Sequence, residues 1–114
     1  MGISRAHTVD VVIADEASLS DSQEVGSGEI AGLAVPTIVS AALTFQGSVD
    51  GTTFFDLYDN DGTTETAIGA STGGRFFAAP AALSSVPYLK VRSGTSAAAV
   101  NQTSGPITIT VVFK

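Results

Sequence analysis

The chain has 114 residues, of which 44% are hydrophobic and 14% charged, with no cysteine and a single histidine. This length suits one domain, and the lack of cysteine excludes disulfides and zinc sites built from thiolates. No apolar run approaches the roughly 20 residues of a membrane helix, and nothing after Met1 resembles a secretion signal. We expect a single domain, made in a reducing cytoplasm, with no membrane partner.

The formal net charge of −6 is distributed unevenly. All eleven acidic residues lie between positions 10 and 65, whereas four of the five basic residues lie between positions 75 and 114. Nucleic acid is not an expected partner, because neutralising phosphates needs clustered Lys and Arg. Two interpretations of the asymmetry remain open. It can steer the acidic face of one subunit onto the basic face of another, or it averages out because strands from the two halves interleave.

Short segments of β-forming residues alternate with turn residues after a candidate flexible arm at residues 1–7. Strands are predicted where polar and apolar side chains alternate, or where turns bound a short apolar run. These segments are 8–13, 28–36, 41–45, 54–58, 65–68, 75–78, 87–92 and 107–114.

The connecting segments are also predicted by their composition. Residues 15–28 read as a polar loop around a short edge strand, and residues 80–83 as one helical turn. Asp61-Gly62 predicts a hairpin with a type I′ turn, which needs positive φ. Strands and turns at this spacing are typical of a β-sandwich or barrel. We predict an all-β, single-domain antiparallel β-sandwich over residues 8–114.

One acidic cluster is the best candidate for a cation site, because calcium prefers carboxylate and carbonyl oxygens gathered in one loop. The spacing does not match an EF-hand calcium loop, because Leu57 and Ile68, which have no side-chain oxygen, would occupy its first and last ligand positions. We interpret the cluster as a solvent-exposed turn and expect no bound metal. The cluster comprises Asp56, Asp59, Asp61 and Glu65.

Residues for catalysis are scarce. Ser48, Ser93 and Ser96 lie in predicted turns, but the only histidine, His7, is remote in sequence and lies in the arm. Nothing in the sequence selects a carboxylate pair for glycoside hydrolysis. We therefore expect no enzyme activity, no catalytic residue and no cofactor.

Four residues are candidates for contact with a partner: Tyr58, Arg75, Tyr88 and Arg92. Aromatic and arginine side chains on a sheet face are enriched among interface anchors. The alternative is ordinary packing in the core and at its rim.

Two segments carry a family resemblance. Residues 43–54, LTFQGSVDGTTF, and residues 88–92, YLKVR, are similar to the discoidin-type jelly roll, in which an S-x-D-G-x-x-F hairpin and a Y-[LV]-[KR]-[LV]-R strand lie on one sandwich. A fuller pattern, over about residues 28–114, resembles small virion proteins of tailed phages of the capsid decoration or cement type. That pattern adds Pro36, Ala41-Ala42, Leu57-Tyr58-Asp59, Arg75-Phe76, Pro80-Ala81-Ala82-Leu83 and Ser93-Gly94-Thr95.

The resemblance implies a jelly-roll-like sandwich that binds the outside of a phage head and clamps neighbouring subunits of the major capsid protein, often as a trimer. It implies synthesis in the bacterial cytoplasm and a final location on the capsid exterior. We expect residues 1–16 to lie on a neighbouring subunit, with Val9, Val11 and Ile13 as apolar anchors. The alternative is a carbohydrate- or host-surface-binding module of a phage tail or fibre, with Tyr58, Tyr88 and Arg92 near the ligand.

Overall fold

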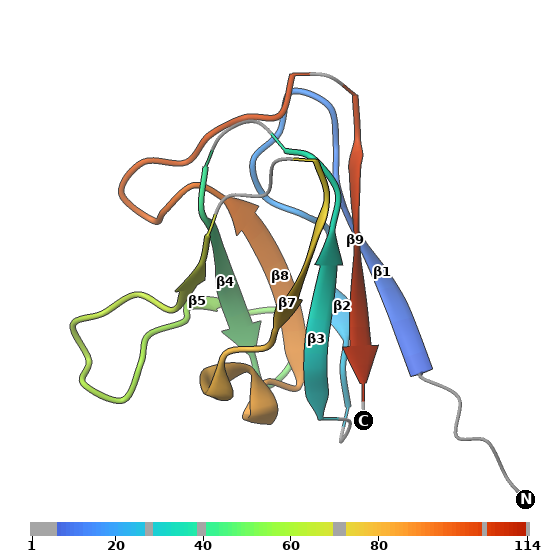
Figure 1. The fold of residues 1–114 in the computed structure, drawn as a ribbon. Coiled ribbons are helices and arrows are strands. Elements are labelled where there is room, and N and C mark those ends of the chain that lie inside the picture. Colours follow the sequence, from blue (N-terminus) through green and yellow to red (C-terminus); the bar gives the residue numbers. More distant parts are fainter. Residues whose placement is uncertain (1–6, 27–28, 39–40, 70–72, 104, 114) are drawn as a thin grey trace, which may run out of the picture.

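Two antiparallel β-sheets pack face to face in the computed structural model of the chain, which describes residues 7–26, 29–38, 41–69, 73–103 and 105–113 (Figure 1). The first sheet has the strand order β1 (His7–Ile13), β9 (Ile107–Phe113), β3 (Ile30–Val35) and β7 (Arg75–Ala78). The second has the order β2 (Gln23–Glu24), β8 (Tyr88–Ser93), β4 (Leu43–Ser48) and β5 (Phe55–Asp56), with β6 (Ala67–Ile68) also paired to β4. The all-β sandwich predicted from the sequence is confirmed.

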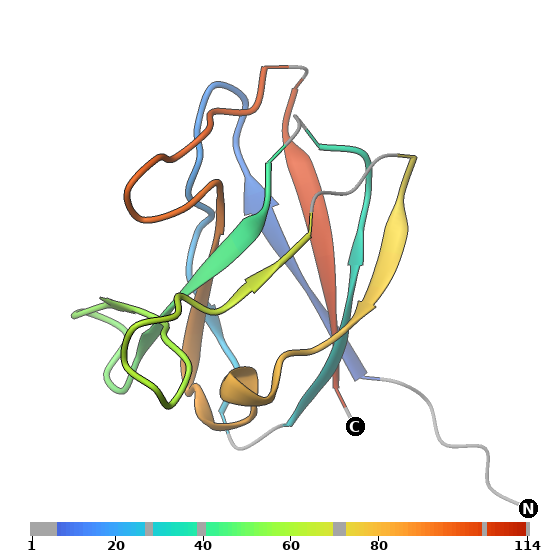
Figure 2. The ribbon, with the colours of Figure 1, turned by 60° about the vertical axis from the view of Figure 1, so that its left-hand side comes forward.

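The chain crosses between the sheets at almost every connection, from β1 to β2 to β3 to β4 and later from β7 to β8 to β9 (Figure 2). β5 and β6 pair with successive residues of β4 on the side that β8 leaves free, so they act as one interrupted edge strand. With that strand counted once, two four-stranded sheets are wound in the order of a jelly roll.

β1 and β9 show how the sequence pattern produces the sandwich. They pair along seven residues each, from His7 opposite Phe113 to Ile13 opposite Ile107. Because side chains alternate across a strand, Val11 and Ile109 point inward while Thr108 points to solvent. β9 then also pairs with β3, which ties the end of the chain into the centre of the first sheet.

The hydrophobic core fills the space between the sheets. Burying one large aliphatic or aromatic side chain stabilises the fold by about 1.5–3 kcal/mol, and both sheets supply such side chains. The largest fully buried apolar side chains are Phe45, Ile13, Leu33, Leu43, Leu83, Leu89 and Ile109. Leu83 comes from a short 3-10 helix, η1 (Ala81–Ser85), which covers one end of the sandwich between β7 and β8 (Figure 1).

Several boundaries differ from the prediction. β4 continues through Ser48 into a segment predicted as a turn, and the strand predicted over residues 54–58 is reduced to Phe55–Asp56. The predicted type I′ turn is wrong, because Gly62 has φ +72° while Asp61 is not among the residues with positive φ. A hairpin does form there, with Tyr58 bridging Glu65.

The predicted arm at residues 1–7 falls almost entirely outside the described residues, and its last residue, His7, begins β1. In the part of the chain that is described, no helix combines the length and apolar character needed to span a bilayer.

Candidate functional site

Among the residues that the structure describes, four large apolar side chains stand out from the surface of the sandwich. Val49 is 83% exposed, Phe55 69%, Phe76 66% and Tyr58 42%. Val49, Phe55 and Tyr58 belong to the β4–β5 turn, to β5 and to the loop after it, whereas Phe76 lies on β7 in the other sheet. Single exposed apolar residues are ordinary, but a group around a hollow marks a contact surface.

Val49 and Phe55 border such a hollow, which we call the apolar hollow. It has a volume of about 220 Å³ and lies where β4 and β5 meet η1. Gly47 forms part of its floor, where a Cβ would lie only 3.1 Å from Val86 Cγ1. The lining of the hollow is mainly aliphatic, so its chemistry suits an apolar side chain. The lining residues are Gly47, Ser48, Val49, Phe55, Asp56, Leu57, Ala82, Val86 and Pro87.

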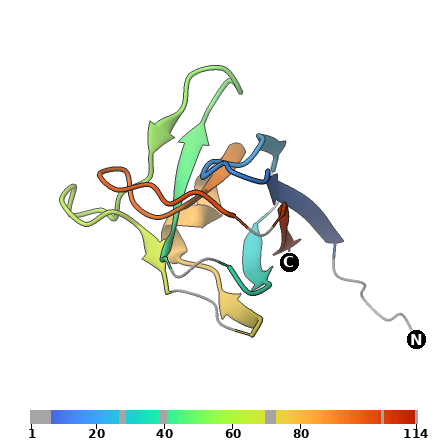
Figure 3. The ribbon, with the colours of Figure 1, turned by 90° about the horizontal axis from the view of Figure 1, so that it is seen from above.

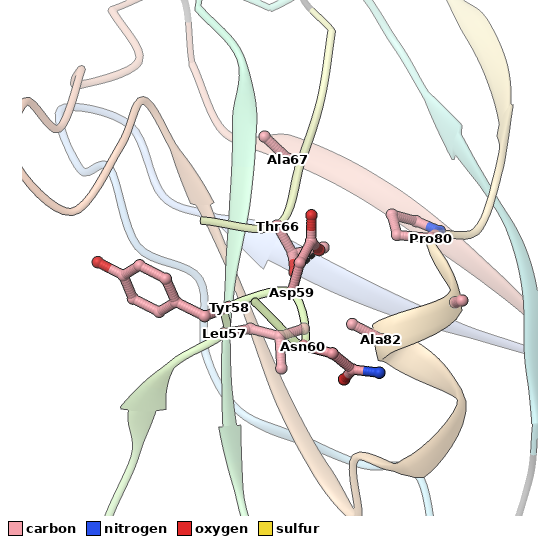
Figure 4. Close-up of a pocket in the computed structure, with 9 residues that line it drawn as sticks. Leu57, Tyr58, Asp59, Asn60, Thr66, Ala67, Pro80 and Ala82 are labelled. Carbon is pink, nitrogen blue, oxygen red and sulfur yellow. Dashed lines mark hydrogen bonds between the residues drawn. The ribbon is translucent and has the colours of Figure 1, made fainter. Parts of the chain in front are cut away.

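A larger groove lies between residues 57–66, which we call the 57–66 loop, and η1. Its volume is about 710 Å³, and Leu57 and Thr66 line it opposite Pro80 and Ala82 (Figure 4). Asp59 also lines the groove, and its Oδ1 accepts a hydrogen bond from Thr66 Oγ1 at 2.7 Å.

Figure 4 shows the ring of Tyr58 directed away from Pro80 and Ala82. The groove is therefore bordered by the backbone of Tyr58, while the ring faces solvent.

The 57–66 loop is fixed at its base by a buried arginine. Arg92 is 7% exposed, and its Nη1 lies 2.8 Å from Asp56 Oδ1 while its Nη2 lies 2.6 Å from Glu65 Oε2. Asp56 ends β5 just before the loop, and Glu65 lies near its other end. One guanidinium therefore joins both ends of the loop, which matches its planar fork of donors.

Further hydrogen bonds join this arginine to β4 and to the loop after β8. Arg92 Nε donates to Thr44 Oγ1 at 3.0 Å, and Thr44 Oγ1 donates to the carbonyl of Gly94 at 2.7 Å. The carboxylate of Glu65 also accepts the backbone N–H of Ser96, at 3.1 and 3.2 Å to its two oxygens. We call Thr44, Asp56, Glu65 and Arg92 the Arg92 cluster.

The electrostatics of the cluster favour the charged carboxylate. The hydrogen bond from Arg92 is the main reason that the pKa of Asp56 lies below its ordinary value, and a hydrogen bond from Gln46 adds to it. Partial burial acts in the opposite direction but is the weaker effect.

The two turns beside these surfaces share one sequence, D-G-T-T, at residues 50–53 and 61–64. Asp50 Oδ1 accepts the N–H groups of Thr52 and Thr53 at 2.8 and 3.0 Å. Asp61 Oδ1 accepts those of Thr63 and Thr64, both at 2.9 Å.

These hydrogen bonds lower the pKa of both aspartates. The side chain and backbone of Thr64 are the largest influences on Asp61, whose pKa falls to about 2. The identical four letters at the two positions are the sequence signal for this repeated turn.

The predicted acidic cluster is not a gathered site. Asp56 and Glu65 bind Arg92, Asp59 bonds to Thr66, and Asp61 bonds within its own turn. Within the described ranges, no three His, Cys, Asp or Glu side chains are placed to share a metal ion.

Three predicted interface anchors lie in β1 and face this chain's own core. Val11 and Ile13 are fully buried, and Val9 packs against the same core. Their apolar character is explained by their packing in the core and by the pairing of β1 with β9, so the structure gives them a role in the fold. Their contact with a neighbouring subunit stays a prediction.

The other four predicted residues do not form one patch. Arg92 is buried in its ion pairs, and Tyr88 is half-buried beside Gly51, where a Cβ would lie 3.0 Å from its ring. Tyr58 is exposed on the 57–66 loop, and Arg75 is exposed on β7 in the opposite sheet.

The exposed apolar residues Val49, Phe55 and Phe76 were not predicted as surface contacts. Strand periodicity cannot identify them, because each lies at a strand edge or turn where alternation no longer decides burial.

Comparison of the chain with protein-family models, with curated proteins and with solved structures finds no match.

Proposed function

We propose that this chain is a non-enzymatic structural protein of a virion, a capsid decoration or cement protein that binds the outside of an assembled tailed-phage head and stabilises it. The observation that supports a contact function is the apolar hollow, bordered by the exposed side chains of Val49 and Phe55. The phage context rests on the resemblance over residues 28–114.

The hollow is built on ordered backbone. Ser48 Oγ accepts the N–H groups of Asp50 and Gly51, at 3.2 and 2.9 Å. Asp50 Oδ1 in turn accepts the N–H groups of Thr52 and Thr53. A surface whose backbone is already ordered loses less conformational entropy on binding. This rigidity suits a protein that docks on a repeated lattice.

The proposed partners are the major capsid protein and further copies of this chain, in a homo-oligomer for which the resemblance favours a trimer. Nucleic acid and membrane are not proposed partners. A protein that binds only the assembled lattice stabilises that lattice by mass action. This requires no chemistry beyond shape and apolar contact.

The carbohydrate-binding alternative is less well supported. It needs Tyr58, Tyr88 and Arg92 near one ligand, but the guanidinium of Arg92 already donates to Asp56, Glu65 and Thr44. Of the three, only Tyr58 offers a freely exposed ring.

Sedimentation with empty expanded phage heads tests the proposal. Purified protein is mixed with the heads, pelleted and quantified, and we expect saturation at a fixed ratio to capsid subunits. Phe55→Asp is expected to abolish pelleting because it places a charge at the edge of the hollow. Ala97→Asp is the matched control, because it adds the same charge in an exposed loop after β8. The hollow lies beside the start of β8, at the other end of that strand.

Absence of pelleting by the wild type, or equal pelleting by Phe55→Asp, would contradict the proposal. Binding to a glycan array in place of capsids would support the tail or fibre module instead.

A further inference from the structure

The two sheets present four strand edges, and three of them are short, interrupted or partly covered. β2 is only two residues long, and the strand formed by β5 and β6 is interrupted by the 57–66 loop. On β1, Asp21 covers the open side of Val12. Asp21 Oδ1 accepts the N–H of Val12 at 3.2 Å, and the N–H of Asp21 donates to the carbonyl of Val12 at 3.3 Å. Short strands and covered edges are the usual protections against edge-to-edge pairing.

β7 lacks these protections in its central part. It pairs with β3 on one side, and Figures 2 and 3 show no coloured segment on its other side. Its last three residues, Phe76, Phe77 and Ala78, carry no charge, and Phe76 is 66% exposed.

The register of β7 determines which backbone groups face the open side. Ala79 donates its N–H to the carbonyl of Ala31 at 3.1 Å, in line with the pairing of Phe77 with Leu33. Residues that bond to a neighbour alternate with residues that bond away from it. The N–H and C=O groups of Phe76 and Ala78 therefore point to the open edge, where no described residue receives them.

We propose that β7 pairs with β7 of a second copy, antiparallel and about a two-fold axis at Phe77. This pairing does not depend on the proposed function, and its two-fold contact is an alternative to the trimer that the resemblance favours. Phe76 of each copy exchanges both backbone hydrogen bonds with Ala78 of the other. The first sheet of one copy then continues into the first sheet of the other copy. The contact is self-complementary, as a two-fold axis requires.

The side chains agree with this register. Phe76 comes opposite the small Ala78 of the second copy, as it now lies opposite Ala34 and over Gly32 within its own sheet. On the inner side, the two half-buried Phe77 rings meet at the axis as a cross-strand aromatic pair.

The charges on β7 do not oppose this register. Arg75 comes opposite Ala79 of the second copy, so the two arginines lie at opposite ends of the contact.

Analytical ultracentrifugation of the purified chain, without capsids, tests the pairing at concentrations up to about 1 mM, a range that detects weak association. We expect a species of twice the 11.5 kDa chain mass that grows with concentration. Ala78→Pro removes an N–H that makes no bond within the chain, and we expect it to weaken association at least about tenfold. Ala78→Ser keeps the N–H and is expected to associate like the wild type.

A wild type that remains at the single-chain mass would overturn the proposal, as would equal association by Ala78→Pro. A species of three times the chain mass would also overturn it, since a two-fold contact cannot close a trimer, and would support the trimer that the resemblance favours. The pairing would also be overturned if the wild type stayed at the single-chain mass and Ala78→Pro, but not Ala78→Ser, failed to pellet with capsids. That result would mean that β7 pairs with a strand of the capsid protein.

Amide hydrogen exchange provides a readout that does not depend on any variant folding. In the wild type, protection of the Phe76 and Ala78 amides should rise with protein concentration. Unchanged protection across the same concentrations would contradict the pairing.

Discussion

The two sheets of this sandwich are stabilised in different ways. The first sheet is built on the long pairing of β1 with β9, with β9 at its centre and its side chains alternating between core and solvent. The second sheet ends in a broken strand whose two parts are held together by Arg92, a residue that reaches them from β8. The first relies on a local pattern and burial, and the second on a few polar contacts between distant residues.

The largest effect is expected in the ladder. Ile109→Ala removes a fully buried side chain from the central strand β9, and we expect it to destabilise the fold by about 2–5 kcal/mol. Thr108→Ala, one residue away on the solvent side, should change stability by less than about 0.5 kcal/mol. Urea unfolding of both variants measures the difference, and similar losses in the two would contradict the inward-outward assignment of β9.

The second prediction concerns the Arg92 cluster. Arg92→Met leaves Glu65 and Asp56 without their cation, and we expect a loss of about 1–3 kcal/mol, reduced because the Asp56 side chain is 35% exposed. Arg92→Lys should rescue little, because an ammonium group cannot bond to both carboxylates and Thr44 in the same planar geometry.

Urea unfolding gives the energies for these two variants, and amide exchange over residues 57–66 shows whether the loop has loosened. Full rescue by Arg92→Lys would mean that charge alone maintains the loop.

The third prediction separates strain from contact in the two D-G-T-T turns. Gly51 has φ +80° and a Cβ would lie 3.0 Å from the ring of Tyr88, whereas Gly62 has φ +72° with nothing within 4 Å. Gly62→Ala should cost about 1 kcal/mol through backbone strain alone, and Gly51→Ala should cost more. Thermal unfolding of the two variants measures the difference, and equal losses would show that Tyr88 moves aside freely.

The smallest expected effect is a dependence of stability on pH. Because Arg92 lowers the pKa of Asp56 in the folded state, the stabilisation is complete above the ordinary value of 3.8 and is lost as the pH falls below it. Urea unfolding between about pH 5 and pH 3 should show a steeper loss for the wild type than for Arg92→Met. The same slope in both proteins would mean that the pair does not contribute.

Regular strands were predictable because their signal is local. The alternation in residues 107–114 predicts a strand, and the structure has β9 over Ile107–Phe113 with Ile109 buried and Thr108 exposed. The β7 segment at residues 75–78 was predicted with its observed bounds.

The candidate site was much less predictable. Arg92 was predicted as a surface contact, because its place on the outward face of β8 gives no sign that Asp56 and Glu65 would cover it. Those carboxylates lie 36 and 27 positions away in sequence.

By itself, the sequence determined that the chain forms short antiparallel strands with one buried face, since a period of two residues is a property of neighbouring positions. Only the tertiary structure decided that β1 turns its apolar residues into its own core, that Arg92 is buried between two carboxylates, and that β7 is left with an open edge. Each of these depends on which distant segment lies beside a strand, and winding two sheets into a jelly roll is what brings those segments together.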